Sequence, residues 1–152
     1  MEKRIIALIL TISAALGAHT AVFAGDEISV MLDGNKIEFD VQPQIINDRT
    51  MVPMRKIFEA FGANVDWIED TRMILASSGN KFILMQIDMP TVIIKDIKAD
   101  TEQRTPLDCA PLISDGRTLV PVRAVSESLS ADVQWDGESR TVYITTGKGE
   151  AK

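Results

Sequence analysis

The sequence RTMVPMRKIFEA at residues 49–60 returns 68 positions later as RTLVPVRAVSES at residues 117–128. Without any gap, residues 40–76 align with residues 108–144, and 13 of the 37 aligned positions are identical. Agreement of this extent indicates an internal repeat rather than a chance match. Residues shared by both copies are those that the folding unit needs twice, whereas an active site belongs more naturally to one copy or to the seam between them.

The first copy is predicted to contain a hairpin, a helix and further strands. Asp33-Gly34 suits a type I′ turn between two stretches of alternating apolar residues. Pro53 suits the first position of a helix, because its missing N–H would be unpaired there in any case. Gly62 suits the left-handed residue that follows a helix. The predicted strands are residues 28–32, 37–41, 65–67, 73–75 and 82–87, and the apolar helix stripe is Met54, Ile57, Phe58 and Phe61.

The second copy is predicted to repeat this order, with a helix at residues 121–129 and with polar residues 98–103 forming a loop. Its predicted strands are residues 92–95, 132–135 and 141–145. The pattern indicates an α+β fold made of two repeated units, each a mostly antiparallel β-sheet with one packed α-helix. The copies are assigned to residues 25–88 and 89–146. Because a unit of about 60 residues buries a marginal core alone, we expect the two copies to pack together.

The N-terminus has the pattern of a secretory signal peptide. Lys3 and Arg4 precede an apolar run at residues 5–18, and Val22-Phe23-Ala24 places small residues where a signal peptidase cleaves. Residues 1–24 are therefore predicted to be removed on export, with retention as an N-terminal anchor as the alternative. The mature chain is expected to be secreted or associated with the cell envelope, with no membrane span, and residues 147–152 are predicted to form a flexible tail.

Composition excludes several classes of function. Removal of residues 1–24 would leave 14 basic and 21 acidic residues, a net charge of −7, which disfavours nucleic-acid binding. The single histidine, His19, lies in the signal segment, so the mature chain has no imidazole for a catalytic triad or metal site. Cys109 aligns with Val41 and is predicted to be a small buried side chain rather than a nucleophile. No catalytic residue, cofactor-binding residue, metal ligand or cofactor is predicted.

The repeated polar and aromatic residues have both structural and functional interpretations. Arg55 and Glu59, like Arg123 and Glu127, are spaced for an i,i+4 helix salt bridge, with an anion-binding or acid–base pair as the alternative. Arginine at the earlier position opposes the favoured dipole order, which suggests that it reaches a sheet carbonyl or an aspartate. Both tryptophans alternate in phase with a valine and are predicted to be buried rings, with a sugar-stacking platform as the alternative. The repeat-motif residues are Arg49, Pro53, Arg55, Glu59, Trp67, Arg117, Pro121, Arg123, Glu127 and Trp135.

These residues resemble the copper amine oxidase N-terminal domain, also called the stalk domain. The resemblance rests on R-T-Φ-V-P-Φ-R followed by glutamate and a V-x-W strand, twice in register, and it covers roughly residues 28–145. The family occurs as tandem copies in exported proteins of Gram-positive bacteria. In amine oxidases the domain is a non-catalytic appendage, so the resemblance implies an accessory role and no enzymatic activity.

The expected function is a non-catalytic exported tandem stalk-domain protein that acts as a cell-envelope binding or assembly module. A cell-wall glycan or a surface protein is the expected partner. The alternative is a carboxylate-dependent hydrolase of cell-wall glycans with its site at the seam between the repeats. A homo-oligomer formed through exposed sheet edges is a third possibility.

Overall fold

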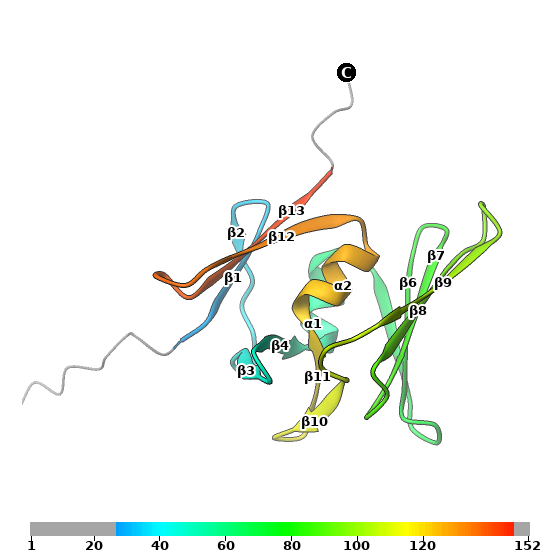
Figure 1. The fold of residues 1–152 in the computed structure, drawn as a ribbon, viewed down its shortest axis with the longest axis horizontal. Coiled ribbons are helices and arrows are strands. Elements are labelled where there is room, and N and C mark those ends of the chain that lie inside the picture. Colours follow the sequence, from blue (N-terminus) through cyan, green and yellow to red (C-terminus); the bar gives the residue numbers. More distant parts are fainter. Residues whose placement is uncertain (1–26, 148–152) are drawn as a thin grey trace, which may run out of the picture.

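The computed structural model describes residues 27–147. The predicted signal segment at residues 1–24 and the predicted tail beyond Gly147 lie outside the described residues. The fold is α+β and rich in sheet, with two short helices, α1 (Met54–Ala60) and α2 (Val122–Ser128). In Figure 1 the two helices lie between a four-stranded sheet and a five-stranded sheet.

The strands form three sheets. Sheet A has the order β12-β13-β1-β2 and consists of β12 (Ala131–Asp136), β13 (Thr141–Thr146), β1 (Ser29–Leu32) and β2 (Asn35–Lys36). Sheet B has the order β10-β11-β4-β3 and consists of β10 (Leu112–Ser114), β11 (Arg117–Pro121), β4 (Arg49–Pro53) and β3 (Gln44–Ile46). Sheet C runs β5 (Asn64–Ile68), β6 (Met73–Ser78), β7 (Lys81–Gln86), β8 (Thr91–Asp96) and β9 (Thr101–Pro106).

Sheet B joins the two occurrences of the repeated motif at its centre. Strands β4 and β11 are antiparallel, and Val52 lies directly opposite Val120, its counterpart at the 68-residue offset. Leu119 faces Pro53, and Pro121 faces Met51, so the same contact is made in both directions. All of these side chains except Pro53 and Pro121 are 0% exposed, and the prolines are also buried. The two occurrences of the motif are therefore paired around a local two-fold axis.

The outer sheets draw strands from distant parts of the chain. Strand β1 pairs in parallel with β13, with Val30 opposite Val142. Strand β7 pairs with β8, which lies beyond the expected boundary at residue 88. Sheet C thus contains strands from both sides of that boundary, and so does sheet A.

A single large core fills the space between sheets A and C. Val30, Phe58, Ile74, Val125 and Val142 are each at most 2% exposed and belong to this cluster. The apolar helix stripes supply its middle, and the inward faces of the sheet strands supply its two sides. A smaller cluster of Met51, Cys109 and Leu119 lies at sheet B.

Three sequence predictions about local structure are wrong. The strand predicted at residues 37–41 does not form, because β2 ends at Lys36 and Ile37 and Phe39 pack against the core without belonging to a strand. Residues 101–103, predicted as loop, begin strand β9, because backbone pairing with β8 at a sheet edge requires no apolar pattern in the side chains. Pro53 and Pro121 lie one position before the helices rather than at their first residue. Each ends a strand with extended ψ angles of 121° and 119°.

Other local predictions are confirmed. Asp33 and Gly34 both have positive φ (48° and 82°), as a type I′ turn requires. Gly62 follows α1 with φ +72°, and Ser130 takes the same left-handed conformation after α2, with φ +62°. Both helices therefore end in the same way, although only the first has glycine at this position.

Substitutions at the two helix ends are expected to change the free energy of unfolding in opposite directions. Ser130→Gly is expected to raise the free energy of unfolding by about 0.5–1 kcal/mol, because a left-handed conformation costs a residue with a Cβ roughly 1–2 kcal/mol. Gly62→Ala is expected to lower it by about 1 kcal/mol for the same reason. No heavy atom lies within 4 Å of a Cβ added at Gly62, so a clash does not contribute. Urea denaturation of both variants measures the changes, and an equal sign for the two would contradict this account.

Candidate functional site

Two similar grooves lie on opposite flanks of sheet B. The Trp67 groove has a volume of about 560 Å³, and the Trp135 groove has a volume of about 540 Å³. Both fall within the range of roughly 300–1,000 Å³ that is usual for ligand sites. The Trp67 groove is lined by Asp40, Pro53, Met54, Arg55, Lys56, Glu59, Trp67, Glu69, Ile113, Gly116, Arg117 and Thr118. The Trp135 groove is lined by Ile45, Asp48, Arg49, Thr50, Asp108, Pro121, Val122, Arg123, Val133, Trp135 and Val142.

Most lining residues of one groove have their counterpart at the 68-residue offset in the other. Each takes its tryptophan, proline and helix arginine from one occurrence of the motif, and its isoleucine, arginine and threonine from the strand hairpin of the other. Ile45 is 44% exposed and Ile113 is 48% exposed at the groove edges. Each groove is therefore built from both halves of the chain.

Two reciprocal ion pairs bridge the halves beside the grooves. The Arg49 Nε donates to Asp108 Oδ2 at 2.9 Å, and the Arg117 Nε donates to Asp40 Oδ2 at 2.8 Å. These four residues are two counterpart pairs, so Arg49 pairs with the counterpart of Asp40. The hydrogen bond from Arg117 lowers the pKa of Asp40, and the hydrogen bond to Asp108 raises the pKa of Arg49. Because the pairs are exposed to solvent, they orient the arginines more than they stabilise the fold.

The helix arginine of the second motif reaches a sheet carbonyl, as its sequence position indicated. Arg123 Nη1 donates to the Val133 carbonyl at 3.1 Å and lies 3.5 Å from Glu127 Oε1. Its counterparts Arg55 and Glu59 both line the Trp67 groove, but within residues 27–147 no ion pair of 4.0 Å or less joins them. The salt-bridge prediction is thus confirmed for the second motif and is wrong for the first.

The two tryptophans differ in exposure. Trp67 is partly buried against the core, and its indole N–H donates to the Glu69 carboxylate. Trp135 is 42% exposed, so the prediction of a buried ring is wrong there. The counterpart of Glu69 is Gly137, which offers no side chain to hold the indole. The ring of Trp135 is therefore open to a ligand.

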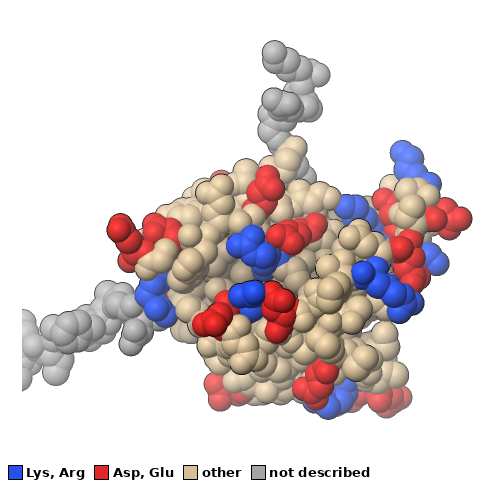
Figure 2. All heavy atoms as spheres, in the orientation of Figure 1, with Lys and Arg blue, Asp and Glu red and all other residues tan. Residues whose placement is uncertain are grey.

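Basic and acidic side chains lie close together on the protein surface, including in both grooves. Figure 2 shows basic and acidic side chains interspersed on one face rather than separated into patches. The Trp67 groove has three basic and three acidic lining residues, and the Trp135 groove has two of each. Neither groove carries a net charge that would select a strongly ionic ligand.

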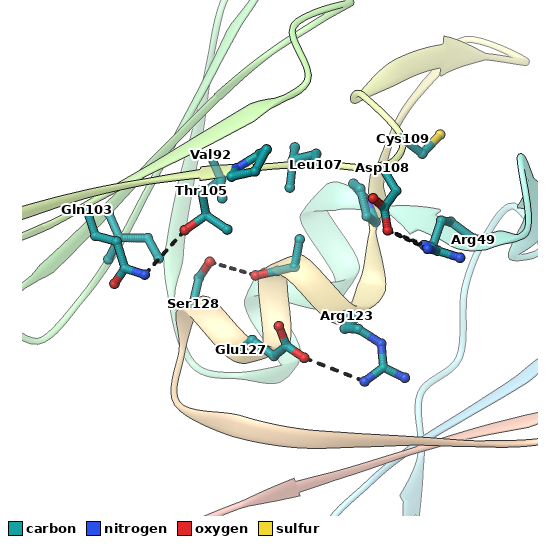
Figure 3. Close-up of a pocket in the computed structure, with 14 residues that line it drawn as sticks. Arg49, Val92, Gln103, Thr105, Leu107, Asp108, Cys109, Arg123, Glu127 and Ser128 are labelled. Carbon is teal, nitrogen blue, oxygen red and sulfur yellow. Dashed lines mark hydrogen bonds and ion pairs between the residues drawn. The ribbon is translucent and has the colours of Figure 1, made fainter.

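A smaller cavity of about 250 Å³ lies next to the Trp135 groove, between α2 and β9. Figure 3 shows Gln103 and Thr105 on one side and Ser128, Glu127 and Arg123 on the other. The Ser128 hydroxyl donates to the Ala124 carbonyl at 2.6 Å. Cys109 is 4% exposed, which confirms the predicted buried thiol.

The sequence pattern did not identify the grooves, although a signal was present. Ile45 and Ile113, and Asp40 and Asp108, are identical in both copies yet exposed. Identity at exposed positions in both copies points to a shared surface rather than to the core. Within residues 27–147, no three His, Cys, Asp or Glu side chains gather as a metal-binding cluster, and neither helix is long and apolar enough to cross a membrane.

Comparison with known protein families gives one family model that matches most of the chain. The family model of the copper amine oxidase N-terminal domain matches residues 31–144. A protein of Brevibacillus choshinensis named "Protease inhibitor" is 28% identical over 120 residues, which are 76% of this chain and 34% of that protein. The chain thus spans about a third of the length of this relative.

Proposed function

Since the chain belongs to the copper amine oxidase N-terminal domain family, we propose that it is a non-catalytic, exported module that binds or assembles material at the cell envelope. In copper amine oxidases this domain is itself non-catalytic, which supports an accessory role. The observation that carries the proposal is the pair of matching grooves, each formed by both halves of the chain. A surface built twice in one small chain suits repeated contact with a repetitive ligand.

The proposed architecture is two copies of one stalk-type unit, residues 25–88 and 89–146, that have exchanged their first hairpins. In support, the β1–β2 hairpin joins the other copy through the pairing of β1 with β13, and the β8–β9 hairpin does so through the pairing of β8 with β7. The exchange leaves neither copy complete alone. Both grooves therefore exist only when the two copies are folded together.

The proposed ligand is an uncharged cell-wall glycan. A sugar ring has an apolar C–H face that stacks on an indole. Its hydroxyls accept hydrogen bonds from arginine and donate hydrogen bonds to carboxylates. Trp135 supplies an exposed indole, and Arg49, Arg123 and Asp108 line the same groove. The balanced charges favour a neutral chain over an anionic polymer, as does the net negative charge of the protein.

A binding role fits the carboxylates better than hydrolysis does. A glycoside hydrolase needs one carboxyl group with a raised pKa to act as general acid. Arg117 instead lowers the pKa of Asp40, and Asp108 is held by Arg49. The seam aspartates thus serve as fixed hydrogen-bond acceptors.

Co-sedimentation with insoluble wall glycan tests this function. The full chain is expected to sediment with the glycan, and Trp135→Ala is expected to weaken binding at least about tenfold, as loss of one stacked aromatic ring would. Tyr143→Ala is the matched control, because Tyr143 is 44% exposed and lies outside both grooves.

Three results would reject the proposal. The first is a lack of binding to wall glycan, and the second is an equal loss in the Tyr143 variant. The third is release of soluble sugar, which would indicate a hydrolase. Because one relative is named a protease inhibitor, protease inhibition without glycan binding would instead assign the grooves to a protein partner.

A further inference from the structure

The face of sheet C that points away from the helices carries a row of apolar side chains. Leu75, Leu84 and Ile93 lie directly opposite one another on β6, β7 and β8. They point away from the inward residues Ala76, Ile83 and Val92, since neighbours along a strand face opposite sides of a sheet. All three are partly exposed, and none belongs to the main core cluster.

Further apolar residues extend this face. Phe82 and Met73 are partly exposed beside the row, and Ile68 is 40% exposed on the edge strand β5. No described element lies beyond this face of sheet C in Figure 1. The name "outer face C" refers below to Ile68, Met73, Leu75, Phe82, Leu84 and Ile93.

The fold does not require an entirely apolar row here, because the counterpart row in sheet A mixes polar and apolar residues. Ile68, Met73 and Leu75 correspond at the 68-residue offset to Asp136, Thr141 and Tyr143. In sheet A the matching row reads Gln134, Tyr143, Met31 and Lys36. Two sheets of related sequence thus differ on their outer surfaces, and an exposed apolar face on one of them marks an interaction site.

The ends of the apolar row carry opposite charges. Asp66 on β5 lies opposite Leu75, and Arg104 on β9 lies opposite Ile93. The complete row across the sheet is therefore Asp66, Leu75, Leu84, Ile93 and Arg104. Arg104 also pairs with Glu102 on the same face, with its Nη2 2.8 Å from the Glu102 Oε1.

This order of charges is complementary to itself. A two-fold axis that lies between two facing copies and runs along β7 places β5 of each copy over β9 of the other. Asp66 then faces Arg104, Leu75 faces Ile93, and Leu84 faces Leu84. Facing sheets whose strands are aligned are a standard packing arrangement, and a two-fold contact uses the same patch on both partners.

From these observations we propose that outer face C is the interface of a homodimer in which two copies of this chain pack sheet against sheet. The apolar row supplies the buried centre of the contact, and the Asp66–Arg104 pairs fix its register. The sheet-edge pairing that the sequence offers as a third possibility is a different contact, since it uses backbone groups and not this face. The groove surfaces are separate from the dimer contact, so a dimer would present four grooves.

Analytical ultracentrifugation of the full chain tests the dimer. The wild-type chain is expected to sediment at twice its mass of 16.7 kDa at micromolar concentration. Leu75→Asp is expected to raise the dimer dissociation constant about 100-fold or more, because two unpaired carboxylates would be buried in each dimer. Tyr143→Asp, at the counterpart position in sheet A, is expected to leave the dimer unchanged.

Exchanging the charges at positions 66 and 104 distinguishes a specific dimer contact from non-specific apolar association. Asp66→Arg alone and Arg104→Asp alone are each expected to weaken the dimer at least about tenfold, because like charges would then face each other. The double variant restores opposite charges between copies and is expected to recover most of the affinity. This test does not depend on whether Leu75→Asp folds.

The proposal is overturned by a wild-type chain that stays monomeric at about 100 μM, a concentration at which even weak specific dimers are populated. It is equally overturned if a folded Leu75→Asp variant dimerises as well as wild type, or if the charge exchange fails to restore binding. Glycan binding by a monomeric chain would leave the proposed function intact and remove only the dimer.

Discussion

Replacing Phe58 by alanine is expected to lower the free energy of unfolding by about 3–5 kcal/mol, the usual cost of removing a fully buried aromatic ring. Phe58 is 0% exposed and lies on α1, between the two outer sheets. Its ring belongs to the main core, so the cavity left by alanine would be bounded by packed side chains. Urea denaturation followed by circular dichroism measures the change.

Ser126→Ala provides the matched control for this substitution. Ser126 is the counterpart of Phe58, is also 0% exposed, and donates its hydroxyl to the Val122 carbonyl of its own helix at 2.7 Å. Because this bond is local and alanine is the better helix former, the change is expected to stay within about 1 kcal/mol. A larger loss for Ser126→Ala than for Phe58→Ala would show that the core is centred on α2 and not on α1.

Val30→Ala is expected to lower the free energy of unfolding by about 2–3 kcal/mol and to loosen the distant end of the chain. Val30 is 0% exposed on β1, and its partner across the parallel pairing is Val142 on β13. The loss of packing should therefore increase amide exchange in β12 and β13 more than in β4 to β6. Hydrogen exchange with mass spectrometry locates the effect along the sequence.

Met31→Ala is the control for this prediction. Met31 pairs with Tyr143 on the same two strands but points to the outer side of sheet A and is only partly buried. Its replacement is expected to cost less than about 1 kcal/mol, because little apolar surface returns to water. If Val30→Ala instead loosened residues 49–68 most strongly, the pairing of β1 with β13 would be wrong.

These two predictions differ in how far the sequence alone could support them. The buried stripe that includes Ile57 and Phe58 follows from helical spacing, so the importance of Phe58 could be argued without a structure. The effect of Val30 on β13 could not, because the two strands are more than 100 positions apart. Alternation in β1 predicts which residues face inward but not which strand lies beside it.

The candidate site likewise has features that the sequence indicates and features that depend on the tertiary structure. Both tryptophans were identified from the repeat, but their exposure depends on neighbours outside the motif. Glu69 holds Trp67, and Gly137 leaves Trp135 open. Asp40 and Asp108 are identical at the 68-residue offset, yet their role as partners of Arg117 and Arg49 appears only when the halves meet.

The sequence by itself determined the fold class and most local elements: the Asp33-Gly34 turn, the two short helices that follow Pro53 and Pro121, and most of the alternating strands. These features depend on backbone preferences and apolar spacing within short windows. Only the tertiary structure decided how the strands are shared among the sheets. The two copies of the repeat have nearly the same alternation of apolar and polar residues. A strand from either copy therefore satisfies the same backbone preferences and the same apolar spacing. The choice between them depends on which arrangement buries the whole set of apolar faces in one core.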